Sequence, residues 1–86
     1  MKDYPEVIEL PAKLRNISNR LVKIENNLYK LESDGVFVFD WGGLDHIDSI
    51  CPRGGYPLKV NDKIDKFLIN RIFYAADIQR HVIELY

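Results

Sequence analysis

The most chemically reactive side chains of this sequence lie near its centre. Asp45, His46 and Asp48 precede Cys51, so four potential metal ligands fall within one short segment. Their spacing fits no established zinc pattern, because a second Cys or His at a fixed interval is missing. A solvated turn explains the segment better, and we expect no bound metal and no cofactor. A small metal-dependent hydrolase built on these residues is the least favoured hypothesis.

Cys51 could instead act as a nucleophile, if His46 or His81 accepted its proton. Its neighbours Ile50 and Pro52 are apolar, and free cysteine is among the residue types most often buried. We therefore expect Cys51 to be a small buried hydrophobic residue. A cysteine hydrolase is as disfavoured as the metal enzyme, and we expect the protein not to be an enzyme.

A second candidate site is the run Arg53, Gly54, Gly55 and Tyr56. Adjacent glycines let backbone amides converge on an anion, and an arginine can hold a phosphate or carboxylate with two hydrogen bonds. The aromatic ring could stack on a base. Because glycines also mark ordinary turns, a plain turn is the favoured interpretation. Binding of a nucleotide or phosphorylated metabolite is the alternative function.

The N-terminal third carries the strongest pattern in the sequence. Its apolar residues recur at alternating intervals of three and four: Val7, Leu10, Leu14, Ile17, Leu21, Ile24, Leu28 and Leu31. Such heptad spacing predicts a long amphipathic helix. Pro11 removes a helical hydrogen bond, so we expect the helix to begin there, although a kink at Pro11 is the alternative. Small residues at 33–35 should end it.

A small β element is expected in the middle of the chain. The β-branched and aromatic run 36–41 lies between glycines and predicts a buried strand. Residues 44–51 have helical spacing up to Pro52, which predicts one or two helical turns. Residues 57–60, beyond the glycine-rich loop, could form a second strand that pairs with the first.

The C-terminal region predicts a second long helix, more buried than the first. Asn61 is a good helix N-cap, and the apolar residues from 64 to 85 cover a broad helical face. The helix would run to Tyr86 or break after Ala76. Arg71 and Gln79 fall within this face, where a polar group needs a partner.

Those two polar side chains admit two interpretations. Arg71 could form an ion pair with Asp40, Asp45 or Asp48 inside the protein, or Arg71 and Gln79 could face a binding partner. The sequence does not decide between them.

Composition limits the class of protein. The chain has 86 residues, 47% hydrophobic and 29% charged, with a net charge of −1 and a single cysteine. We expect one domain, 1–86, of a size at which oligomerisation commonly adds buried surface. Positive charge is not concentrated anywhere, which argues against nucleic acid. No long apolar stretch predicts a membrane span, and the lone cysteine favours a cytoplasmic location.

These observations predict an α+β fold: a long N-terminal amphipathic helix, a small central two-stranded element with a glycine-rich loop, and a long apolar C-terminal helix. The expected function is a non-enzymatic protein-binding protein, a regulator, inhibitor or assembly factor. It would act as a homo-oligomer, such as a coiled-coil homodimer, and bind another protein. The expected contact residues are Leu14, Ile17, Leu21, Ile24, Leu28 and Leu31, with Val22 and Tyr29 at the edge. The sequence leaves open whether this helical face packs within or between subunits.

Overall fold

The structure is a computed structural model that describes residues 3–17, 19–33, 35–41 and 46–86, with only the backbone of Asp40 and Trp41. These residues form nine strands and no helix. The strands are β1 (Val7–Glu9), β2 (Arg20–Glu25), β3 (Leu28–Leu31), β4 (Val36–Trp41), β5 (Ile47–Pro52), β6 (Leu58–Lys59), β7 (Lys63–Ile64), β8 (Phe67–Ala75) and β9 (Arg80–Leu85). The predicted α+β class is therefore wrong, and the fold is all-β.

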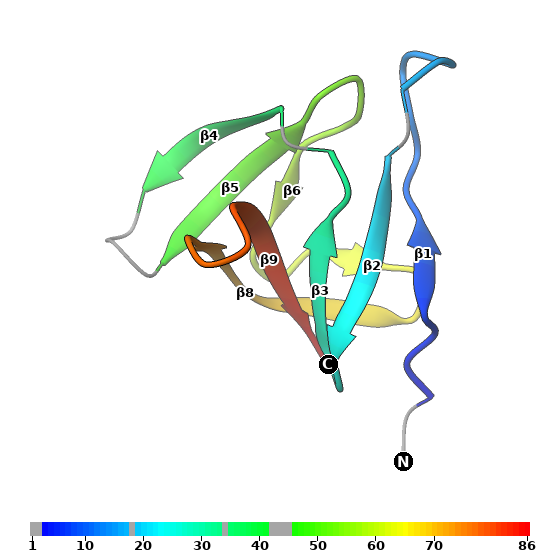
Figure 1. Cartoon of the computed structure of the whole chain (residues 1–86), viewed down its shortest axis with the longest axis vertical. Helices are drawn as coiled ribbons and strands as arrows, with labels where there is room; N and C mark the ends of the chain where they lie inside the picture. Colours follow the sequence, from blue (N-terminus) through cyan, green and yellow to red (C-terminus); the bar gives the residue numbers. More distant parts are fainter. Residues whose placement is uncertain (1–2, 18, 34, 42–45) are drawn as a thin grey trace.

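The strands form two sheets (Figure 1). Six strands in the order β1-β2-β3-β9-β8-β7 make a curved, half-barrel sheet, and β4-β5-β6 make a smaller sheet beside it. All the pairings are antiparallel. In the larger sheet β1 and β7 are the edge strands, and in the smaller sheet β4 and β6 are. The half-barrel is therefore open between β1 and β7.

The predicted N-terminal helix is absent from the described residues, and the second half of its range, 20–31, forms the hairpin of β2 and β3. Asn26, at a φ of 38°, lies in the turn, where paired asparagines favour a left-handed hairpin connection. Leu21 pairs with Leu31 across the hairpin and both are fully buried, whereas Ile24 is exposed. Burial alternates along β3, and the heptad spacing arose from residues of several strands and the loop before β2.

The central region is partly as expected. The strand at 36–41 is present as β4, but it lies at a sheet edge and is not buried on both faces. The expected helical turns over 44–51 are wrong where residues are described, because 47–52 form β5; positions 44 and 45 lie outside the described residues. The strand expected at 57–60 is β6, and it pairs with β5, not with β4.

The predicted C-terminal helix is also wrong, since its residues form the β8–β9 hairpin. Asn61, expected to cap that helix, lies in a turn with a φ of 79°, and Gln79 lies in the hairpin turn with a φ of 55°. A β-bulge between Ile69 and Arg71 shifts the alternation along β8. This shift spreads the apolar positions, so that they imitate the broad face of a helix.

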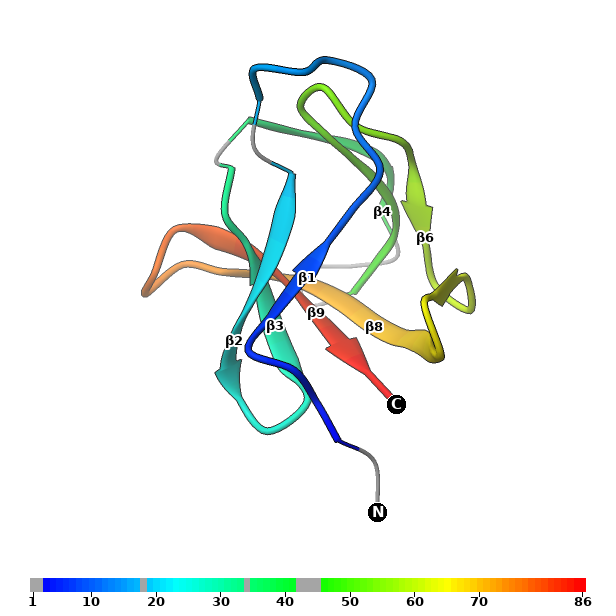
Figure 2. The same cartoon turned by 90° about the vertical axis from the view of Figure 1, so that its right-hand side faces the viewer.

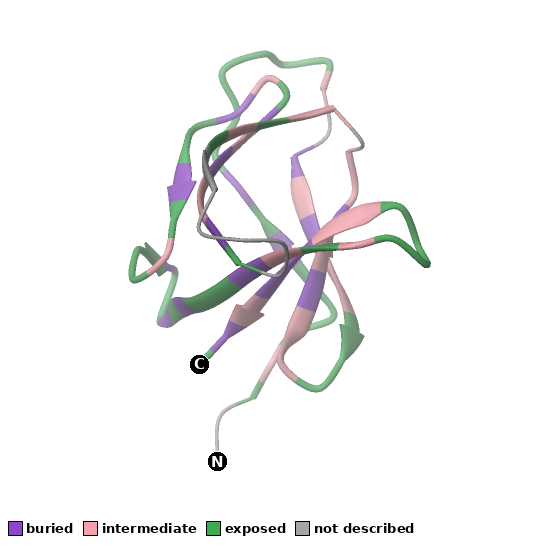
Figure 3. Cartoon of the chain, turned by 90° about the vertical axis from the view of Figure 1, so that its left-hand side faces the viewer, coloured by how far each residue is buried: buried purple, intermediate pink, exposed green. Residues whose placement is uncertain are grey.

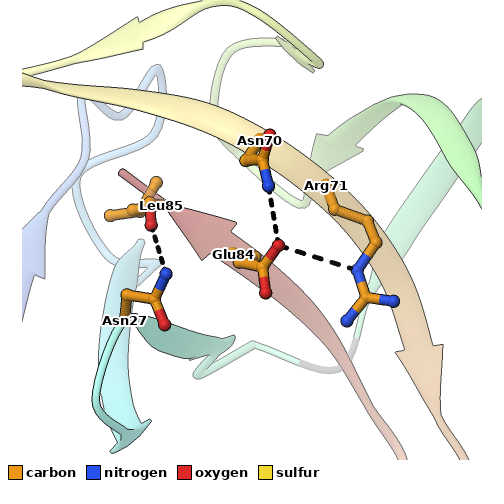
Figure 4. A network of polar contacts seen from close by, with 5 residues as sticks. All are labelled: Asn27, Asn70, Arg71, Glu84 and Leu85. Atoms are coloured by element: carbon orange, nitrogen blue, oxygen red, sulfur yellow. Dashed lines mark hydrogen bonds and ion pairs between the residues drawn. The ribbon is translucent and has the colours of Figure 1, made fainter.

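Arg71 has a partner on the neighbouring strand, Glu84. Of the three aspartates proposed from the sequence, Asp45 and the side chain of Asp40 lie outside the described residues. The Nε of Arg71 lies 3.9 Å from Glu84 Oε1, which also accepts a hydrogen bond of 2.8 Å from Asn70 Nδ2 (Figure 4). Asn27 Nδ2 donates to the Leu85 carbonyl at 2.6 Å. These contacts tie the β2–β3 turn and β8 to β9, and they indicate a structural role for Arg71.

An apolar cluster of the described residues joins the two sheets. Buried residues gather where the strands cross, and exposed residues lie mainly in the loops and turns (Figure 3). The cluster consists of Ile8, Leu10, Leu21, Tyr29, Leu31, Ile47, Ile50, Leu58, Ile64, Phe67, Ile69, Ile72, Ile83 and Leu85. Since β1 and β7 contribute to it and Val36 and Val38 of β4 pack against it, the core fixes the position of the sheet edges that carry the candidate sites.

Candidate functional site

The contact residues expected on the first helix do not form one surface. Leu21, Tyr29 and Leu31 are fully buried in the core. Leu14 and Ile24 are exposed, and Ile17, Val22 and Leu28 are half-buried. Because these side chains lie on opposite faces of strands or in a loop, the predicted helical contact face does not exist.

The reactive side chains near the centre form only a small cluster. His46 Nε2 lies 2.9 Å from Asp48 Oδ1, and both side chains are exposed; Asp45 lies outside the described residues. The thiol of half-buried Cys51 lies 3.6 Å from the carbonyl oxygens of Pro52 and Gly55. Within the described ranges, no three His, Cys, Asp or Glu residues gather as a metal site would require.

The Arg53–Gly55 turn has a structural explanation. The Arg53 amide donates to the Gly35 carbonyl at 2.7 Å, and the Gly55 amide donates to the Pro52 carbonyl at 3.0 Å. Gly54 adopts a φ of 73°, which favours glycine. Two of the amides expected to converge on an anion are therefore engaged within the fold. Anion binding at this turn stays a prediction that depends on the Arg53 side chain.

The same turn holds the loop that follows β1. The Gly54 carbonyl accepts hydrogen bonds from the amides of Lys13, at 2.7 Å, and Leu14, at 3.2 Å. Ala12 forms an isolated β-bridge with Gly55. These backbone contacts join residues 12–14 to the turn and make a ridge across one end of the molecule.

The buried side chain of Asn19 packs against this ridge on its inner side. It is only 4% exposed, and its Nδ2 donates to the Pro11 carbonyl at 2.8 Å. A Cβ added at Gly55 would overlap with the same nitrogen. Glycine is therefore required at position 55 for close packing, independently of any ligand.

On one side of the ridge lies a groove of about 690 Å³, here called the basic groove. Its lining residues are Lys13, Leu14, Gly35, Val36, Phe37, Cys51, Pro52, Arg53, Gly54 and Gly55. The two charged side chains of this lining, Lys13 and Arg53, are both cationic. The groove therefore combines apolar walls with positive charge.

Beside this groove β4 presents a pair of exposed aromatic rings. Phe37 is 74% exposed and Phe39 is 60% exposed, and their rings stack with centroids 6.4 Å apart and planes inclined by 25°. Val36 and Val38, on the opposite face, pack against the core. Alternation along a strand places one apolar pair in water when the other is buried. Sequence reasoning missed this site because it assigned the whole run to a buried strand.

On the other side of the ridge lies a second groove of about 870 Å³, here called the acidic groove. Its walls come from β1 and from the segment that carries β6 and β7, and Figure 2 shows how these strands are placed. Its lining residues are Pro5, Val7, Ile8, Glu9, Leu10, Pro11, Tyr56, Pro57, Leu58, Asp62, Lys63, Ile64 and Asp65. Among these are three carboxylates and one ammonium group. Sequence reasoning missed it because its walls are far apart in the chain.

Tyr29 and Tyr56 connect these grooves to the rest of the fold. The Tyr29 hydroxyl donates to the Pro5 carbonyl at 2.5 Å, and burial, followed by the nearby Glu6 and Tyr4, raises the pKa of Tyr29. It therefore remains a donor that holds the start of the acidic groove. Tyr56, predicted at an anion site, lines the acidic groove, and Lys13 Nζ lies 5.1 Å from its ring centroid.

No helix long and apolar enough to cross a membrane occurs in the described part of the chain.

The chain was compared with protein families, curated proteins and solved structures. No family model, no curated protein and no solved structure matches the sequence or the fold. The two grooves and the exposed aromatic pair are therefore the features of this protein that indicate a function.

Proposed function

We propose that this chain is a non-enzymatic protein-binding protein that docks an extended segment of another protein along β4. The observation that carries the proposal is the stacked, exposed pair of Phe37 and Phe39 on a strand at the edge of its sheet. Full burial of a phenylalanine side chain contributes about 1.5–3 kcal/mol. A partner that covers both rings would therefore gain substantial free energy.

The backbone of β4 supports docking of a strand. The Arg53 amide bonds to the Gly35 carbonyl, and Phe37 lies opposite Cys51. In an antiparallel pair the bonded positions alternate, so the peptide groups of Phe37 face β5 and those of Val36 and Val38 face the free edge. An extended peptide can bond to these groups and extend the sheet.

The charge of the adjoining groove indicates the chemistry of the partner. Lys13 and Arg53 are the charged side chains of the basic groove. Arginine binds carboxylates through paired, charge-assisted hydrogen bonds. We therefore expect the docked segment to combine apolar residues, which cover the phenylalanines, with Asp or Glu.

The test is a selection from a displayed library of random linear peptides, followed by affinity measurements. We expect acidic, apolar peptides to be enriched. The double variant Phe37→Ser/Phe39→Ser should weaken their binding at least about tenfold, without unfolding, since both side chains are exposed. Ile78→Ser is the matched control, because Ile78 is an exposed apolar residue in the β8–β9 turn.

Three outcomes would overturn the proposal. One is a selection whose peptides bind the double variant as well as the wild type. Another is a wild-type dimer in light scattering that the double variant converts to a monomer, which would assign β4 to a second copy and support the expected homo-oligomer. The third is binding of a single-stranded oligonucleotide that depends on both rings.

The anionic small-ligand function is retained as the second candidate because Lys13 and Arg53 line one groove. A panel of nucleotides and phosphorylated metabolites should then raise the melting temperature, and Arg53→Ala should abolish the rise. Stability itself should change by less than about 0.5 kcal/mol in this variant, because the side chain is exposed. A wild type that no anionic ligand stabilises would remove this candidate.

A further inference from the structure

We propose a second docking site, independent of β4: the acidic groove accepts an extended basic segment of another protein as an added strand on β1. The groove is the opening of the half-barrel, because β1 and β7 end the six-stranded sheet and both line it. Residues of each edge thus face the same cavity. An added strand would lie in the place where a closed barrel continues its sheet.

The register identifies which backbone groups of β1 are free to pair. Leu10 donates to the Asn19 carbonyl at 2.9 Å, Lys23 donates to the Glu6 carbonyl at 2.8 Å, and Ile8 pairs with Leu21. The bonded positions of β1 are therefore the even-numbered ones. The peptide groups of Val7 and Glu9 consequently point away from β2, toward the open side.

On the opposite wall of the groove, β7 has one residue whose peptide groups also point away from its neighbouring strand. Leu68 exchanges hydrogen bonds with Tyr86, at 2.8 and 3.0 Å, so its peptide groups face away from β7. Lys63, which pairs with Leu68, therefore directs its own peptide groups outward. A strand in the groove meets polar backbone on both sides.

Prolines limit the length of this edge. Pro5 and Pro11 flank β1, and neither has an amide to donate. Their carbonyl oxygens are engaged by Tyr29 and Asn19 respectively. The pairing edge is thus confined to residues 7–9, which protects the protein from open-ended strand addition and leaves room for one short segment.

The charge of the groove decides the chemistry of the occupant. Glu9, Asp62 and Asp65 contribute three negative charges to the lining and Lys63 contributes one positive charge, a balance of −2. Apolar contacts come from Val7 and Ile64. A strand with Lys or Arg alternating with apolar residues would place cations beside the carboxylates and apolar side chains against the walls.

The test uses two synthetic peptides with blocked ends: one alternates Lys with Val, and the other alternates Glu with Val. Amide hydrogen exchange of the protein, followed by NMR, is the readout. We expect the lysine peptide to slow the exchange of Val7 and Glu9 severalfold, because these amides become donors to the added strand. The glutamate peptide should leave both rates unchanged.

Variants separate backbone pairing from charge. Val7→Pro removes an amide that does not face β2, so the fold should persist and affinity should fall at least about tenfold. Val7→Thr, which keeps the amide, should bind as the wild type does. Glu9→Gln/Asp65→Asn should weaken binding and reduce its salt dependence; asparagine suits position 65, whose φ is 54°.

The result that would overturn this proposal is unchanged exchange at Val7 and Glu9 with the lysine peptide at millimolar concentration. Equal binding of the two peptides would overturn it as well. A wild-type dimer that Val7→Pro dissociates would assign the edge to a second copy instead. The Phe37→Ser/Phe39→Ser variant should still bind the lysine peptide. A failure of the proposal for the acidic groove is therefore distinguishable from a failure of the proposal for β4.

Discussion

The two grooves adjoin one ridge but are built in different ways. The basic groove depends on a loop held to a turn, where Lys13 and Leu14 bond to the Gly54 carbonyl. The acidic groove lies between strands whose inner residues, such as Ile8 and Ile64, belong to the core. The basic groove therefore depends on a few contacts between a loop and a turn, whereas the acidic groove is formed by the strands of the sheet.

This difference has a consequence for stability. A change that loosens the ridge should affect the basic groove first, whereas the acidic groove should persist as long as β1 remains paired with β2. Loops joined by a few backbone bonds open locally at low free-energy cost, and core strands open only on global unfolding. A change that unfolds the domain should remove both grooves, and a change confined to the ridge should remove only the basic groove.

Leu21→Asp should have the largest effect. Leu21 is fully buried on β2 opposite Ile8, so an unpaired carboxylate there should cost several kcal/mol, about 4 or more, and unfold the domain. Ile24→Asp is the matched control, since Ile24 lies on the same strand but is exposed. Its effect should stay within about 0.5 kcal/mol. Urea unfolding followed by circular dichroism measures both.

The pair also tests the architecture. On the predicted amphipathic helix, Leu21 and Ile24 would share one buried face, and the two aspartates would be equally damaging. In the β hairpin they differ in burial. Equal destabilisation by both changes would contradict the strand assignment and with it both grooves.

The sequence predicted individual elements of this fold better than its class. The run Val36–Trp41 was identified as a strand because β-branched and aromatic residues favour extended backbone. The same composition in β8, which contains Phe67, Ile69 and Ile72, was outweighed by an apparent helical spacing. A β-bulge and a hairpin turn produced that spacing, and neither follows from periodicity alone.

The N-terminal error has a comparable cause. The consecutive residues Asn26 and Asn27 are a turn signal, but they fall inside the helix that the heptad spacing predicts. The acidic groove depends on which strands lie side by side, since residues 7–9 and 63–64 face one cavity. The basic groove depends on the pairing of residues 12–14 with a turn far along the chain. Such long-range pairing is set by tertiary packing, so the grooves could not be located from local sequence.

Gly55→Ala should have an intermediate effect confined mainly to the ridge. The added methyl group overlaps with Asn19 Nδ2, which is buried and bonded to Pro11, so overpacking should cost about 1–3 kcal/mol. Gly35→Ala is the control: its Cβ lies 2.9 Å from Cδ of exposed Arg53, and that flexible side chain can move.

Limited trypsin digestion should locate the damage. In Gly55→Ala, cleavage after Lys13 or Arg15 should accelerate, because residues 12–14 lose their attachment to the turn. The lysine peptide should still slow exchange at Val7 and Glu9. Loss of both grooves together at a temperature where the variant remains folded would contradict the separation between them.

The smallest expected effect is a pH dependence that involves neither groove. His81, on β9, lines neither cavity, and its ring packs edge-on to Tyr74 with centroids 4.9 Å apart. Burial lowers the pKa of His81 below its ordinary value of 6.5. Between the pKa of His81 in the folded chain and its value in the unfolded chain, the unfolded chain binds more protons than the folded one. His81 therefore makes the protein less stable as the pH falls through about 6.5.

The variant His81→Phe keeps an aromatic ring beside Tyr74 and removes this titration, while His46 is unchanged. The wild type should therefore lose more unfolding free energy than His81→Phe between about pH 7.5 and about pH 5.5. Urea unfolding at the two pH values measures this difference, and an equal loss in both proteins would show that the fold does not lower the pKa of His81.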